Sequence, residues 1–141
     1  MSVDIFVFLA LENVPDVAKW NRALAERSTH LHITEDADLN KHSGYLPMTL
    51  DGQATGCEFY RGPYSELAKS SPRLKAPPFQ HTIFYQLSFH SDPNEAAACL
   101  LSASVLVASF DGVAFDPQGG AYVSERELVD SAGALRELGE P

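Results

Sequence analysis

The sequence predicts an α+β fold in which a mostly antiparallel sheet carries two helices on one face, as in a ferredoxin-like sandwich. The pattern of apolar residues indicates two β-α-β segments, one in each half of the chain. A β-hairpin is expected between the two segments, and a further helix is expected at the C-terminal end. A sheet curved around the second helix is the alternative arrangement. No linker or repeat divides residues 1–141, so we expect one domain.

The first β-α-β segment occupies the N-terminal quarter of the chain. Val3–Leu11 is an almost continuous apolar run, which is typical of a central strand buried on both faces. A helix is predicted to follow to about Arg27, with Pro15 in its first position. Its apolar stripe consists of Val17, Trp20 and Leu24. Thr29–Thr34 alternates polar and apolar residues, which predicts a half-exposed strand.

A hairpin is predicted in the middle of the chain. Asp51-Gly52 is its turn signal, and it joins expected strands at Tyr45–Leu50 and Thr55–Tyr60. Alternation in the second strand turns Cys57 and Phe59 toward the core and Glu58 and Tyr60 outward. Residues 61–80 then contain four prolines and are predicted as a long irregular loop that permits a short helix around Ser65–Lys69.

The second β-α-β segment begins with a long alternating strand at His81–His90. An apolar helix is expected to follow Asp92 and end at Phe110, with Gly112 in the left-handed conformation after it. Residues 113–115 and 121–123 are predicted to form a short hairpin. Ser124 and Glu127 then form a capping box that opens the terminal helix.

The composition excludes several classes of protein. The chain has 10 Lys+Arg and 19 Asp+Glu, so its formal net charge is −9. This balance argues against nucleic acid and anionic membrane surfaces as partners. The apolar run Ile5–Leu11 is too short to span a membrane and lacks the flanks of a signal peptide. Two isolated cysteines are typical of a reducing compartment, so we expect a soluble cytoplasmic protein.

One pair of histidines could bind a metal. His30 and His32 are two residues apart in a predicted strand, so they are expected to share a face. A Zn²⁺ or Fe²⁺ site needs a third ligand, for which Asp36, Asp38 and His42 are the candidates. Because the pair supplies only two ligands, we interpret it first as a solvated strand face, and a metal-binding protein or metal-assisted enzyme stays the alternative.

No catalytic or cofactor-binding motif is present in the sequence, so a non-catalytic protein without a cofactor is expected. Cys57 follows no helix start that would lower its thiol pKa, and a buried structural role is predicted for it.

Protein binding is the function that the remaining residues favour. Glu35, Asp36 and Asp38 form an acidic loop, and Tyr45, Tyr60 and Tyr64 are expected near the hairpin. Tyrosines of this kind anchor protein interfaces, and an acidic surface steers a basic partner. These six residues are the predicted partner-binding site.

Three motifs carry a resemblance to known proteins: Gly44-Tyr45-Leu46-Pro47, Gly56-Cys57-Glu58-Phe59-Tyr60, and Gly112-Val113-Ala114-Phe115-Asp116-Pro117-Gln118-Gly119. They resemble small uncharacterised bacterial proteins, some of which are similar to immunity proteins of polymorphic toxin systems. The resemblance implies a non-enzymatic inhibitor of a basic toxin domain. A small-molecule binding module, with its ligand between the sheet and residues 61–80, is a further alternative. Monomer and homodimer are both left open.

Overall fold

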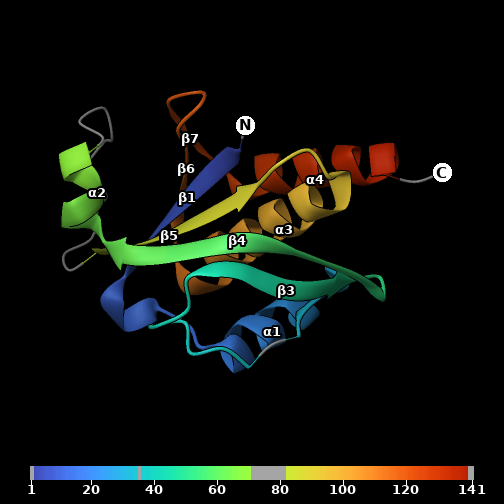
Figure 1. Ribbon diagram of the computed structural model, residues 1–141, viewed down its shortest axis with the longest axis horizontal. Helices are drawn as coiled ribbons and strands as arrows, with labels where there is room; N and C mark the ends of the chain where they lie inside the picture. The colour runs from blue at the N-terminus through green and yellow to red at the C-terminus, as the bar shows by residue number, and fades with distance from the viewer. Residues whose placement is uncertain (1, 35, 71–81, 140–141) are drawn as a thin grey trace.

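A computed structural model describes residues 2–34, 36–70 and 82–139 of the chain (Figure 1). Its elements are β1 (Val3–Ala10), η1 (Leu11–Asn13, a 3₁₀ helix), α1 (Val17–Glu26), β2 (Leu31–Ile33), β3 (Gly44–Leu50), β4 (Gln53–Pro63), α2 (Tyr64–Ser70), β5 (Thr82–Phe89), α3 (Pro93–Phe110), β6 (Val113–Asp116), β7 (Ala121–Val123) and α4 (Glu125–Gly139). The chain is therefore of the mixed α+β class, as the sequence predicts.

The strands of the described residues form one antiparallel sheet in the order β2-β3-β4-β5-β1-β6-β7. The apolar strand β1 lies inside the sheet, between β5 and β6. Since each neighbouring pair is antiparallel, β1 runs parallel to β4 and β5 runs parallel to β6. Two β-α-β crossovers thus interleave, and the β2–β3 hairpin extends the sheet beyond β4.

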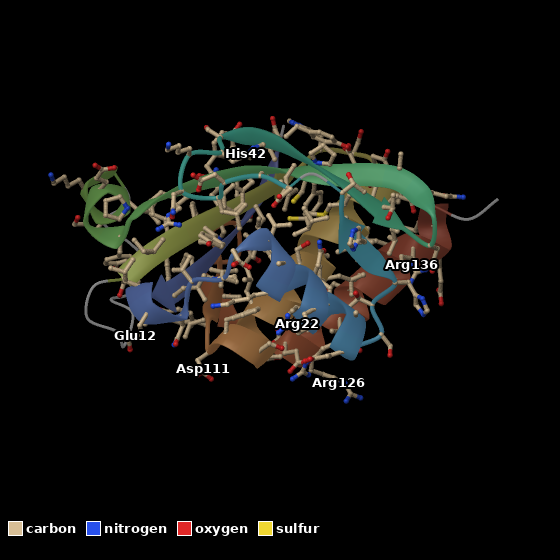
Figure 2. The ribbon with its side chains drawn as sticks, turned by 90° about the horizontal axis from the view of Figure 1, so that it is seen from below. Glu12, Arg22, His42, Asp111, Arg126 and Arg136 are labelled. Carbon is tan, nitrogen blue, oxygen red and sulfur yellow. The ribbon has the colours of Figure 1, made fainter. Side chains whose placement is uncertain are left out.

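Three helices form a layer on one face of the sheet. Figure 2 shows this layer beneath the strands, with Arg22 of α1 and Arg126 of α4 on its outer side. The amphipathic helix α1 buries Val17, Trp20, Ala23 and Leu24 against the sheet. The helix α3 packs between the sheet, α1 and α4, which explains why it is apolar on all sides.

By length and composition α3 could cross a membrane, but 61% of it is buried inside the fold, as in a core helix.

The start of α1 differs from the prediction. The helix begins at Val17, and Asp16 is its N-cap, with the carboxylate accepting a hydrogen bond from the Lys19 amide at 2.7 Å. Pro15 therefore precedes the cap and does not occupy the first helical position. Likewise β1 ends at Ala10, because Leu11 enters η1 and is 53% exposed.

The second predicted strand is shorter than expected. The strand β2 spans only Leu31–Ile33, so the prediction of a strand over Thr29–Thr34 is wrong at both ends. Ser28 and His30 have positive φ angles of 54° and 60°, which a regular strand does not allow. Ser28 follows the C-terminus of α1, where the Thr29 amide donates to the Leu24 carbonyl at 3.2 Å.

The two glycine turns behave differently. Asp51 and Gly52 both have positive φ, as the predicted two-residue hairpin requires. After α3, in contrast, Asp111 adopts the left-handed conformation at φ 56°, so the prediction for Gly112 is wrong. A Cβ at Gly112 would lie 2.8 Å from Val7 Cγ1 and 2.9 Å from the Leu106 carbonyl oxygen. Glycine is needed there for space.

The predicted long loop is partly regular structure. β4 continues to Pro63, and α2 spans Tyr64–Ser70, which includes the short helix expected at Ser65–Lys69. The rest of the predicted 61–80 loop lies outside the described residues. Figure 1 shows α2 at the end of the sheet far from α4. The capping box of α4 is confirmed, with the Glu127 amide donating to Ser124 Oγ at 3.1 Å and the Ser124 amide donating to Glu127 at 3.2 Å.

Candidate protein-binding face

The sheet face opposite α1, α3 and α4 holds the predicted tyrosines Tyr45 and Tyr60, and it is called the tyrosine face below. Directly opposed residues on neighbouring strands share a face, so the register defines rows of side chains across the sheet. The first, the acidic row, is Tyr45–Glu58–Ser88–Asp4. The second, the aromatic row, is Tyr60–Gln86–Phe6–Phe115–Tyr122. The two rows are adjacent, because their members are two residues apart along each strand.

Hydrogen bonds order the acidic row. Ser88 is buried, and its hydroxyl donates to the Asp4 carboxylate, while Gln86 Nε2 donates to Ser88 Oγ at 3.5 Å. Glu58 is partly exposed and lies 3.4 Å from the imidazole of His90. The two carboxylates thus lie on either side of one buried hydroxyl. Among the described strand residues, this face contains no lysine or arginine.

Tyr45 is the most exposed member of the acidic row, at 48%. Its ring lies over Gly56, where a Cβ would come within 2.7 Å of the ring, and its hydroxyl donates to Glu95 at 3.3 Å. Partial burial, and then the negative charge of Glu95, raise the pKa of Tyr45 above its ordinary value. Gly56 is therefore the residue that lets this large side chain lie flat along the sheet.

The helix α2 covers one end of the tyrosine face. Tyr64 packs edge-on against Phe8 at 5.3 Å between ring centroids, and Leu67 joins the same cluster. Phe6, Phe8 and Phe115 are buried there, whereas Tyr60 and Gln86 are half-buried. All three predicted tyrosines therefore lie on one side of the sheet, with Tyr64 at the covered end and Tyr45 in the acidic row.

The predicted acidic loop lies on the other side. Leu39 is buried in the core formed with the helices, and Ala37 packs against that core. Asp36 and Asp38 are exposed on the loop that these two residues anchor, and Glu35 lies outside the described residues. The structure thus brings the tyrosines together and separates them from Asp36 and Asp38.

The histidine pair does not form the expected arrangement. His30 precedes β2 in a left-handed conformation, so it does not share a strand face with His32. His30 Nδ1 lies 4.0 Å from Asp51, and His42 Nε2 lies 2.8 Å from the Tyr45 carbonyl oxygen. In the part of the chain that the structure describes, no three His, Cys, Asp or Glu side chains are placed to hold a metal ion.

Both cysteines are buried and free. Burial is the main cause that raises the pKa of the Cys99 thiol, and proximity to Cys57 adds to it. A thiol with a raised pKa has little thiolate at neutral pH, which fits a structural role for Cys99.

Asp4, Ser88, Gln86 and Phe6 belong to the candidate face, and sequence reasoning did not include them. One signal was available, because Asp4 is the one charged residue in the apolar run of β1. The alternation of β5 also places Gln86 and Ser88 with Phe84, away from the core. What was missing was the strand order, which sets Asp4 beside a residue 84 positions away.

Comparisons with known proteins gave no match: no protein-family model matches the chain, and neither do curated proteins or solved structures. The resemblance to immunity-type proteins therefore depends on the three sequence motifs alone.

Proposed function

We propose that the protein is a non-catalytic binding protein that holds a basic protein partner on the tyrosine face. The observation that carries the proposal is the acidic row beside the aromatic row, on a sheet face whose described strand residues include no cation. Tyrosine rings and carboxylates next to one another are the groups that recognise arginine and lysine side chains.

The exposed part of the face offers both kinds of contact. Glu58 and the exposed Tyr45 are neighbours in one row, and Tyr60 lies in the next. A guanidinium placed over a tyrosine ring gains a cation–π contact, and a carboxylate beside the ring neutralises its charge. Tyr45 is held by its contact with Gly56 and by its hydrogen bond to Glu95, so that less of its side-chain entropy is lost on binding.

Net charge supports the same class of partner. A formal charge of −9 accelerates the encounter with a basic protein and makes association sensitive to salt. We therefore place the protein in the cytoplasm as an immunity-type inhibitor of a basic toxin domain. A ferredoxin-like core, β6-β1-β5-β4 with two interleaved crossovers, is the fold that we assign to it, and the strand order supports this assignment.

The test is an affinity capture from a lysate of the source organism, with the full-length chain as bait, at low and moderate salt. Two variants receive the same charge change: Glu58→Lys on the tyrosine face and Asp36→Lys on the separate acidic loop. We expect one basic protein at a stoichiometric level with wild type and Asp36→Lys. With Glu58→Lys, its recovery should fall by at least about tenfold, as for an interface hot spot.

The proposal is overturned if both variants capture the same proteins as the wild type, or if the captured partner is acidic. Loss of capture with Asp36→Lys alone would move the interface to the loop side. Because Glu58 is partly exposed and its contact with His90 is a surface pair, its substitution should leave the fold intact.

A further inference from the structure

A cavity of about 300 Å³ lies on the helix side of the sheet, away from the tyrosine face. Its walls come from η1, the N-terminal end of α1, the loop after β2 and one residue of β4. The apolar part of the wall consists of Leu11, Val14, Pro15, Ala37 and Leu39, and the polar part consists of Asp16, Lys19, Asp38, Asn40 and Arg61. This size is at the lower end for small-molecule sites.

The four charged groups of this cavity do not pair with one another. No ion pair within 4.0 Å joins Asp16 or Asp38 to Lys19 or Arg61 among the described residues. Elsewhere on the surface, opposite charges do meet, as in Arg27–Glu125 at 2.8 Å. Two cations and two anions are therefore held apart around one hollow.

Arg61 is the cation that β4 contributes to the cavity. It is half-buried, its guanidinium donates to Asn40 Oδ1, and its Cζ lies 6.0 Å from the ring centroid of Tyr85. Neither contact neutralises its charge. Among the described residues no carboxylate forms an ion pair with this half-buried guanidinium, and a bound anion would supply a charge-assisted contact there.

The carboxylates are held in place by the backbone. Asp16 accepts from the Lys19 amide, and Asp38 accepts from the Asn40 amide at 3.0 Å. Buried Leu39 anchors the second of these turns. The negative groups are thus fixed at the cavity wall, with oxygen atoms remaining for a ligand cation.

We propose that this cavity binds a free aliphatic α-amino acid. Arg61 and Lys19 hold its carboxylate, Asp38 holds its ammonium group, and the aliphatic side chain packs against Val14 and the exposed Leu11. A zwitterion matches the separated charges, because the two cations and two anions of the cavity sum to zero and a ligand with a single charge would leave one charge unbalanced. This site is independent of the partner bound on the tyrosine face.

The test uses L-leucine as the probe and isothermal titration calorimetry on the full chain. We expect saturable binding with one site per chain. Two analogues remove one charge each: 4-methylpentanoate lacks the amine, and 3-methylbutylamine lacks the carboxylate. Each analogue should bind at least about tenfold more weakly, since each loses one charged contact.

Variants assign the binding to this cavity. Arg61→Gln should weaken L-leucine binding at least about tenfold, and Arg126→Gln, at an exposed position on α4, should leave it unchanged. Lys19→Gln provides a second test on an exposed helix position, in case loss of the Arg61 contact to Asn40 disturbs the fold. Absence of L-leucine binding, equal binding of an analogue, or full binding by both cavity variants would each overturn the proposal.

Discussion

The side chain of Asn21 forms two hydrogen bonds with the backbone of Ile33. Its Oδ1 accepts from the Ile33 amide at 2.7 Å, and its Nδ2 donates to the Ile33 carbonyl at 2.9 Å. Ile33 belongs to β2, which is an edge strand, and the neighbouring residue Thr34 donates to β3. The amide and carbonyl of Ile33 therefore face away from the sheet, and Asn21 of α1 occupies the place of a missing neighbouring strand.

Removal of this contact should expose the edge. We expect Asn21→Ala to lower the free energy of unfolding by about 1–3 kcal/mol, because two partly buried backbone groups lose their partners. Urea unfolding measures this change, and size-exclusion chromatography with light scattering reports any self-association through β2. Arg22→Ala, one residue further along α1 and exposed, is the matched control and should change stability by less than about 0.5 kcal/mol.

Two glycine-to-alanine variants should have opposite effects. At Gly112 the added methyl group would meet Val7 and the Leu106 carbonyl within 3 Å, so we expect a loss of about 1–3 kcal/mol. At Gly133, inside α4, nothing lies within 4 Å of the added Cβ, so Gly133→Ala should stabilise the protein by about 0.5–1 kcal/mol. Thermal unfolding of both variants measures the difference. Equal effects would show that Gly112 is not a packing requirement.

Ser28→Gly should stabilise the chain. Ser28 has a φ of 54° after the last turn of α1, a position at which glycine is favoured. Relief of this strain is expected to raise the free energy of unfolding by about 1 kcal/mol. The greater flexibility of glycine in the unfolded chain offsets part of this gain. Chemical denaturation tests this, with Ser28→Ala as the control that keeps the strain. A glycine variant no more stable than the alanine variant would contradict the expectation.

Tyr85 should make stability depend on alkaline pH. Burial raises the pKa of Tyr85 to about 12, and the nearby Arg61 opposes this effect. The hydroxyl has no partner in hydrogen-bond geometry in the described structure. The pKa of tyrosine in the unfolded chain is about 10. The contribution of protonated Tyr85 to the free energy of unfolding is therefore fully present below pH about 10. It is lost as the pH rises toward 12, by at most about 1.4 kcal/mol per pH unit.

Tyr85→Phe isolates this contribution. Near neutral pH the variant should be as stable as the wild type or more stable by up to about 1 kcal/mol, since a buried hydroxyl without a partner is removed. Between pH about 10 and 12 its stability should fall less steeply than that of the wild type. Urea unfolding across this range provides the measurement. Identical slopes for the two proteins would show that Tyr85 titrates as in the unfolded chain.

Local patterns in the sequence predict much of the fold. Alternation placed Cys57 and Phe59 toward the core, and the register confirms it. Asp51-Gly52 predicted its hairpin, because only residues that tolerate positive φ fit that turn. The capping box at Ser124 was equally local and equally reliable.

The candidate face depends on contacts that no local pattern contains. The strand order sets Asp4 beside Ser88, and Tyr45 beside Glu58. The acidic loop was expected beside the tyrosines, but buried Leu39 anchors that loop on the helix side. The failure at His30 has a different cause, since its positive φ interrupts the regular strand, and polar alternation does not report it.

The position of β1 within the sheet also affects how the chain is made. Its first neighbour, β5, begins at Thr82, and its second neighbour, β6, begins at Val113. During synthesis, the most apolar strand of the protein therefore leaves the ribosome without a pairing partner, and most of the chain must follow before the sheet closes around it. Such long-range pairing slows folding and prolongs the exposure of apolar surface. The apolar side chains of β1 therefore stay unpaired until β5 has been made.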